Sequence, residues 1–175
     1  MKIFFNQSEK GFTLIETFVA VLILVFAVIG PLGLLSRAIA DGNYAKNQVT
    51  AYYLAQEALE LVINQRDRNL VSGGDWLSGL GACSVSNPCK IYFDALLEVE
   101  PCTPSDDESC RLYIGSNNKY THSGEQSSLF SRYIYLSNNT GNNSANLSVV
   151  VKWMNKNQPV DFALTTQIFD VNYEI

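Results

Sequence analysis

The chain has 175 residues, enough for one soluble domain plus an attached element. Hydrophobic residues make up 47% of it and charged residues 17%, a balance that excludes an intrinsically disordered chain. The net charge is −5 and the Lys and Arg residues are scattered, which argues against nucleic acid as a main partner, because binding phosphates requires clustered cations.

An apolar segment dominates the N-terminal part of the chain. Residues 18–35 carry no charge, and the apolar run from 12 to 35 is long enough for a helix to cross ~30 Å of hydrocarbon. A plain membrane anchor is one interpretation. A secretory signal peptide is another, cut after Ala38-Ile39-Ala40 and before Asp41, although its apolar core is usually only about 7–15 residues long.

A third interpretation rests on the residues that precede this run. The stretch KGFTLIE, residues 10–16, follows a short charged segment, places an apolar residue after Gly11, and puts Glu16 four positions beyond Phe12. This combination resembles the processing site of type IV prepilins and type II secretion pseudopilins. The resemblance covers about 25 residues.

The resemblance implies that residues 1–11 are a leader peptide and that the chain is a substrate rather than an enzyme. A prepilin peptidase would cut between Gly11 and Phe12 and methylate the new amine of Phe12. Further partners would be other pilins or pseudopilins, an inner-membrane assembly platform and, before assembly, membrane lipid. The protein would be a single-pass inner-membrane protein with an exported headgroup, and then part of a periplasmic or extracellular filament. No cofactor is implied.

Glu16 is a functional candidate, because a carboxylate inside a membrane segment is costly. Cleavage would create a positive amine on Phe12, four residues away, so that the two charges could meet within one chain or between neighbours. Such a pair would set the axial step between subunits, and we predict an assembly role for Glu16. The alternative is a carboxylate that snorkels to the membrane surface.

Three residues, Gly30, Pro31 and Gly33, predict a helix break inside the hydrophobic helix of residues 12–36. Pro31 cannot donate a hydrogen bond to the carbonyl of Ala27, and glycines weaken a helix. Either a simple membrane kink or, by family resemblance, a stretch that melts during assembly would fit.

An amphipathic helix half is predicted over residues 37–67. Its apolar residues follow spacings of three and four: Ala51, Leu54, Ala55, Ala58, Leu61 and Val62. We expect it to end at about Arg66 or Asp67, before Ser72-Gly73-Gly74.

Four cysteines lie beyond the helix: Cys83, Cys89, Cys102 and Cys110. An even number in an exported domain predicts disulfides. Three connectivities are open, and proximity favours Cys83–Cys89 and Cys102–Cys110. Their spacings do not fit common zinc patterns, so no metal site is predicted.

Residues 68–175 are predicted to form a β-rich globular headgroup. Alternation predicts one half-buried strand over 90–100, a short strand over 111–114, and three antiparallel strands starting at Leu129, Asn146 and about Phe162. In the middle one of these three, Leu147, Val149, Val151 and Trp153 face one way. A turn is expected at 138–143 and a hairpin connection at 155–159.

No catalytic residue is predicted. His122 is the only histidine and lies in a polar stretch, 121–128, where a solvated loop residue is the expected role. No Gly-rich phosphate loop occurs. The acidic run at Asp106, Asp107 and Glu108 lacks calcium-ligand spacing and predicts a solvated loop.

Taken together, these patterns predict an α+β fold, with a long N-terminal helix packed on a C-terminal antiparallel sheet. The expected function is that of a structural subunit, a minor pilin or pseudopilin. Two alternatives stay open: a membrane-anchored exported binding module or enzyme, and a competence pilus subunit that binds DNA. The first residue of the mature protein discriminates among the interpretations of the apolar segment. A chain that begins at Phe12 supports a pilin, one that begins at Asp41 a signal peptide, and one that begins at Met1 a plain anchor.

Overall fold

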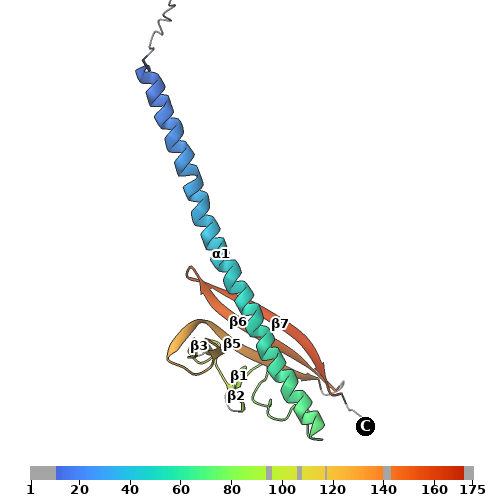
Figure 1. Ribbon diagram of the computed structural model, residues 1–175. Coiled ribbons are helices and arrows are strands. Elements are labelled where there is room, and N and C mark those ends of the chain that lie inside the picture. Colours follow the sequence, from blue (N-terminus) through green and yellow to red (C-terminus); the bar gives the residue numbers. More distant parts are fainter. Residues whose placement is uncertain (1–10, 94–95, 106–107, 117, 140–142, 172–175) are drawn as a thin grey trace, which may run out of the picture. The chain divides into compact units, whose positions relative to one another are not determined.

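The computed structural model describes residues 11–93, 96–105, 108–116, 118–139 and 143–171. The fold is α+β, as predicted: within these residues one helix, α1 (Leu14–Val71), is followed by an antiparallel sheet of seven strands (Figure 1). It divides into two compact units, which are described separately. The N-terminal unit ends at Ala45 and the C-terminal unit begins at Lys46.

In the N-terminal unit, α1 begins because Thr13 caps it. The Thr13 hydroxyl accepts a hydrogen bond from the backbone N–H of Glu16 at 3.3 Å, which satisfies one of the free donors of the first turn. The predicted start at Phe12 is therefore two residues early, and Phe12 precedes the helix.

The helix runs without interruption through Gly30, Pro31 and Gly33. The predicted break is therefore not an end of α1. Pro31 removes one hydrogen-bond donor from the ladder, but the turns on either side keep theirs. Local melting on leaving the membrane stays a prediction.

In the C-terminal unit, α1 ends at Val71, a few residues beyond the predicted end. Gly73 has φ +70°, and the N–H groups of Gly73 and Gly74 bond the carbonyls of Leu70 and Asn69 at 3.0 and 3.1 Å. This pattern is a Schellman motif, in which a left-handed glycine satisfies the last helix carbonyls. The Asn69 side chain extends the helix past Asp67, because it donates to the carbonyls of Trp76 and Ser78.

The sheet has β5 at its centre. The strands are β1 (Cys89–Phe93), β2 (Leu97–Pro101), β3 (Arg111–Ile114), β4 (Tyr120–Thr121), β5 (Gln126–Asn139), β6 (Ser144–Asn155) and β7 (Gln158–Phe169). On one side β5 pairs with β6, which in turn pairs with β7. On its other side β5 pairs with both β3 and β1, and these pair with β4 and β2 respectively.

The single strand predicted over 90–100 is wrong, because the structure has two antiparallel strands there. β1 and β2 pair in a register that sets Ile91 opposite Val99 and Phe93 opposite Leu97. In this register odd-numbered residues of β1 pair with odd-numbered residues of β2, and paired residues lie on the same face of the sheet. All odd-numbered residues therefore share one face in the hairpin, as they would in a single strand. Alternation could not distinguish the two, and Leu96, which breaks the alternation, was the signal. Residues 94 and 95 lie outside the described residues.

The long strands near the C-terminus confirm the prediction and extend it. The hairpin between β6 and β7 uses a two-residue turn at Lys156 and Asn157, both with positive φ, 47° and 67°. Positive φ at both positions matches the right-handed twist of the flanking strands. The short strand predicted over 111–114 is β3. The turn predicted at 138–143 is shorter, since β5 continues to Asn139, and 140–142 lie outside the described residues.

The core of the C-terminal unit lies between α1 and one face of the sheet, which the helix crosses (Figure 1). The predicted inward row of β6, Leu147, Val149, Val151 and Trp153, is buried, and so are Ala51, Leu54, Ala55, Ala58 and Val62 of the helix. Small alanines in this helix face let the backbone approach the sheet. The structure therefore confirms the predicted apolar face of the amphipathic helix, although Leu61 on that face is only partly buried.

Candidate functional site

None of the described residues covers the apolar segment of α1. Every large apolar side chain from Phe12 to Leu35 is exposed, from 40% at Leu22 to 88% at Leu14. Within the described residues, α1 is the one helix that is long and apolar enough to cross a membrane. An exposed apolar surface of this size marks a contact with lipid or with another protein.

Glu16 occupies the third position of this helix, and that gives it a local role that sequence reasoning missed. Thr13 and Glu16 have the Thr-x-x-Glu spacing of a capping box, and the Thr13 half of the box is formed. A carboxylate in the first turn also favours the helix, because the helix dipole is positive there. The Thr-x-x-Glu spacing in the sequence was the signal that could have shown it.

The glycines predicted as site residues are not required by packing within the chain. A Cβ added at Gly11, Gly30 or Gly33 would meet no atom within 4 Å. Packing among the described residues therefore does not require glycine at these positions. The leader predicted over 1–11, apart from Gly11, lies outside the described residues.

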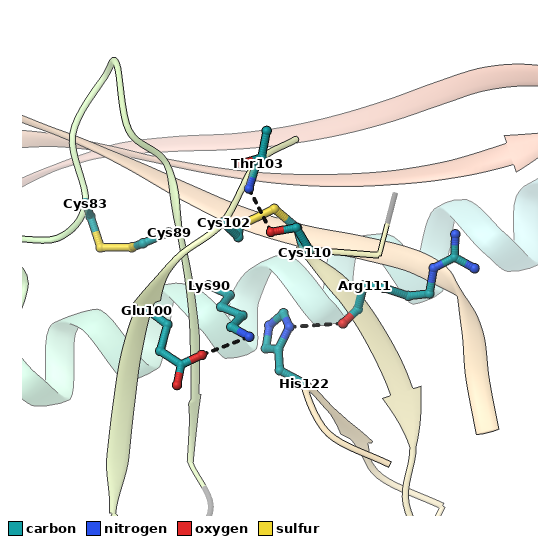
Figure 2. Close-up of a disulfide and its surroundings, with 10 residues drawn as sticks. Cys83, Cys89, Lys90, Glu100, Cys102, Thr103, Cys110, Arg111 and His122 are labelled. Carbon is teal, nitrogen blue, oxygen red and sulfur yellow. Dashed lines mark hydrogen bonds and ion pairs between the residues drawn. A yellow bond between two sulfur atoms is a disulfide. The ribbon is translucent and has the colours of Figure 1, made fainter. Parts of the chain in front are cut away.

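The four cysteines form the two disulfides favoured by proximity, Cys83–Cys89 and Cys102–Cys110, with Cα–Cα distances of 5.0 and 5.4 Å. Figure 2 shows them close to one another, around β1 and the end of β2. The backbone N–H of Cys102 also donates to the carbonyl of Pro88, at 3.0 Å. The bridges thus fasten the loop after α1 to β1, and the end of β2 to the start of β3.

His122 is buried, so the prediction of a solvated loop residue is wrong. Its side chain is 8% exposed, and its Nδ1 donates to the carbonyl of Arg111 at 3.1 Å (Figure 2). Burial, followed by the charges of Arg132 and Lys90, lowers its pKa to about 3, against the backbone hydrogen bond that raises it. A neutral, enclosed imidazole of this kind is a poor general base near pH 7.

Arg132 is a buried cation that sequence reasoning also missed. It is 1% exposed and reaches from β5 to the helix: its guanidinium donates to Glu57 at 2.8 Å and to the carbonyl of Leu54 at 3.0 Å. A further nitrogen donates to the carbonyl of Ile91 at 3.1 Å. Burial lowers its pKa, and the charge of Glu57 opposes that shift. The signal was the inward row Phe130–Arg132–Ile134–Leu136, in which alternation puts an arginine on the core face.

A groove of 810 Å³ opens beside Glu57 on the surface of the C-terminal unit. Its lining comes from one face of α1, from β1 and from β4 with the residue before it: Thr50, Tyr53, Leu54, Glu57, Phe93, Lys119, Tyr120 and Thr121. Aromatic rings therefore stand beside one carboxylate and one ammonium group. Such a surface suits a protein segment that carries both charges.

Among the described residues, no group of three or more His, Cys, Asp or Glu side chains could hold a metal ion. Glu108 is exposed, and Asp106 and Asp107 lie outside those residues.

No family model, curated protein or solved structure matches this chain. Its function therefore has to be argued from its own residues.

Proposed function

We propose that the chain is a subunit of a type IV pilus or a type II secretion pseudopilus. It is cut after Gly11 by a prepilin peptidase, methylated on Phe12, and assembled through the first part of α1. The observation that carries the proposal is the KGFTLIE stretch, which comes directly before an uncharged segment, residues 18–35, whose large apolar side chains are exposed. A leader, an apolar residue and an acid at this spacing resemble prepilins.

The surface of the helix supports a change of environment. Residues 18–35 suit lipid before assembly, and the same apolar side chains suit contact with other helices afterwards. Gly30 and Gly33 lie on the exposed helix with open space around them. Small residues at such positions let helices approach closely in a membrane or a bundle.

The disulfides support export of the C-terminal unit. Both bridges lie in that unit, and disulfides persist in oxidising compartments such as the periplasm or the cell exterior. Lys2 and Lys10 precede the apolar segment, which favours a cytoplasmic N-terminus. The two signs agree on one orientation, in which the helix crosses the inner membrane once.

The test is mass spectrometry of the N-terminus of the protein purified from cells that possess a prepilin peptidase. We expect a chain that begins at Phe12 and carries a methyl group on its amine. A catalytically inactive peptidase should leave the chain starting at Met1. A mature N-terminus at Asp41 would identify a signal peptide, and an intact Met1 in the presence of active peptidase would identify a plain anchor; either result rejects the proposal.

A further inference from the structure

We propose that the groove beside Glu57 in one copy receives residues 37–44 of α1 from a second copy. The inference rests on the proposed function and names a contact that would hold neighbouring subunits together. The groove offers an anion, Glu57, and a cation, Lys119, on different elements. The segment 37–44 offers the opposite pair, Arg37 and Asp41.

The groove combines a carboxylate that is held in a fixed position with exposed aromatic side chains. The carboxylate of Glu57 is held in place by the buried guanidinium of Arg132 at 2.8 Å, yet the Glu57 side chain is still 51% exposed. The aromatic rings of Tyr53 and Phe93 are 64% and 59% exposed at its walls. Exposed aromatic residues are enriched at the centres of protein interfaces.

The segment that fits this surface carries its charges on one helix face. Arg37, Ala40, Asp41 and Tyr44 are spaced by three and four residues, so their side chains lie along one stripe. Arg37 and Asp41 are exposed and take part in no ion pair found among the described residues. Ala40 between them is small and lets the helix approach the aromatic walls.

Charge complementarity favours this segment over the apolar part of the helix. In the docked arrangement Arg37 faces Glu57 and Asp41 faces Lys119. The apolar segment, 18–35, has no charge to pair with either groove residue. Because the groove and the segment are different surfaces of the same chain, the contact is heterologous, and repeating it produces an open helical array rather than a closed dimer.

The experiment is a charge exchange between two exposed residues, made in cells that assemble the filament. The variants are Lys119→Glu, Asp41→Lys and the double variant, all in the full chain. The readout is the amount of subunit in sheared filaments relative to the membrane pool. We expect each single variant to lower this ratio about fivefold or more, and the double variant to restore it to within about twofold of wild type.

A second measurement identifies the neighbour directly. A photo-crosslinking amino acid at Phe93, in otherwise wild-type filaments, should join this position to a peptide within residues 37–44 of another copy. The crosslinked product has the mass of two chains, which separates it from a link within one chain. Formation of both disulfides in each charge variant serves as the folding control.

The contact is overturned if the single variants assemble as wild type does, if the double variant stays as defective as the single ones, or if Phe93 crosslinks to a different protein. Failure of the groove contact is distinguishable from failure of the proposed function. If the chain still begins at Phe12 and still enters filaments, only the groove contact is rejected. If it keeps its first eleven residues, the proposed function is rejected as well.

Discussion

His122 makes the stability of the C-terminal unit depend on pH. Its pKa is about 3 in the folded chain, below the 6.5 of an unperturbed imidazole. Between these values the unfolded chain binds more protons than the folded one. The free energy of unfolding therefore falls as the pH drops below about 6.5, by up to ~1.4 kcal/mol per pH unit from this group.

The prediction concerns His122→Asn, whose amide can donate to the Arg111 carbonyl in place of Nδ1 but cannot titrate. Between pH 6 and pH 4, the free energy of unfolding of this variant should change less steeply with pH than that of wild type. Denaturant titration of the full chain in detergent, followed by tryptophan fluorescence, measures both slopes. Equal slopes would show that His122 is solvated or already protonated in the folded chain.

Arg132 allows a prediction about the geometry of its guanidinium group, separately from its positive charge. Its guanidinium reaches Leu54, Glu57 and Ile91 together, which the single ammonium group of a lysine cannot do. Arg132→Lys keeps the charge and should still lower the free energy of unfolding by about 2–4 kcal/mol, because hydrogen bonds to charged groups are lost in a buried site. A control, Lys90→Arg, changes an ion pair that is partly exposed and should change stability by less than ~1 kcal/mol. Wild-type stability of Arg132→Lys would mean that the fork geometry has no importance.

These two residues also mark where sequence reasoning stopped. For β5 the sequence predicted a strand starting at Leu129, without its inward face. Alternation puts Arg132 on the same face as Phe130 and Ile134, but its partners on α1 and β1 could not be known. His122 follows the two-residue strand β4 in a stretch that is otherwise polar. Its burial depends on packing against Tyr92 and Arg111, which no local pattern encodes.

At the scale of the element, the end of α1 depends on one glycine of two adjacent ones. Gly73 has φ +70°, whereas Gly74 does not have a positive φ, and a Cβ on Gly74 would make only ordinary contacts, at 3.7 and 3.8 Å. Gly73→Ala should therefore lower the free energy of unfolding by about 1 kcal/mol, and Gly74→Ala should leave it unchanged or slightly raised. Both substitutions reduce the conformational freedom of the unfolded chain to the same extent. The difference between their free energies of unfolding therefore measures the backbone strain of an alanine at position 73. The same denaturant titration measures it, and equal effects would reject the Schellman cap.

Element boundaries show which sequence signals were sufficient. Gly73 and Gly74 predicted the stop of the helix within a few residues, and the Val-x-Val-x-Trp pattern predicted β6. The hairpin of β1 and β2 was missed because its register keeps odd positions on one face. The added length of α1 comes from hydrogen bonds between Asn69 and the loop at 76–78, which are tertiary interactions.

For the whole molecule, the α+β architecture and both disulfides followed from the sequence because their signals are long or close together. A charge-free run of this length and a period of two over β5, β6 and β7 leave few alternatives. Cysteines six and eight residues apart are near enough to pair across a short loop. The groove beside Glu57 could not be predicted, since it gathers residues from α1, β1 and the residues around β4.

Glu16 lies at the capping-box position of the first turn of α1, and we also propose that it pairs with the amine of a processed N-terminus. Thr13→Ala removes the capping hydroxyl but keeps the charge. Glu16→Gln removes the charge but keeps a side chain that suits the capping box. If the charge pair matters in the filament, Glu16→Gln should lower incorporation into sheared filaments at least tenfold, because an unpaired buried charge costs about 3–5 kcal/mol, while Thr13→Ala should lower it only slightly. The reverse order of effects would assign Glu16 to the helix cap alone, and N-terminal mass spectrometry of each variant shows whether cleavage after Gly11 was unchanged.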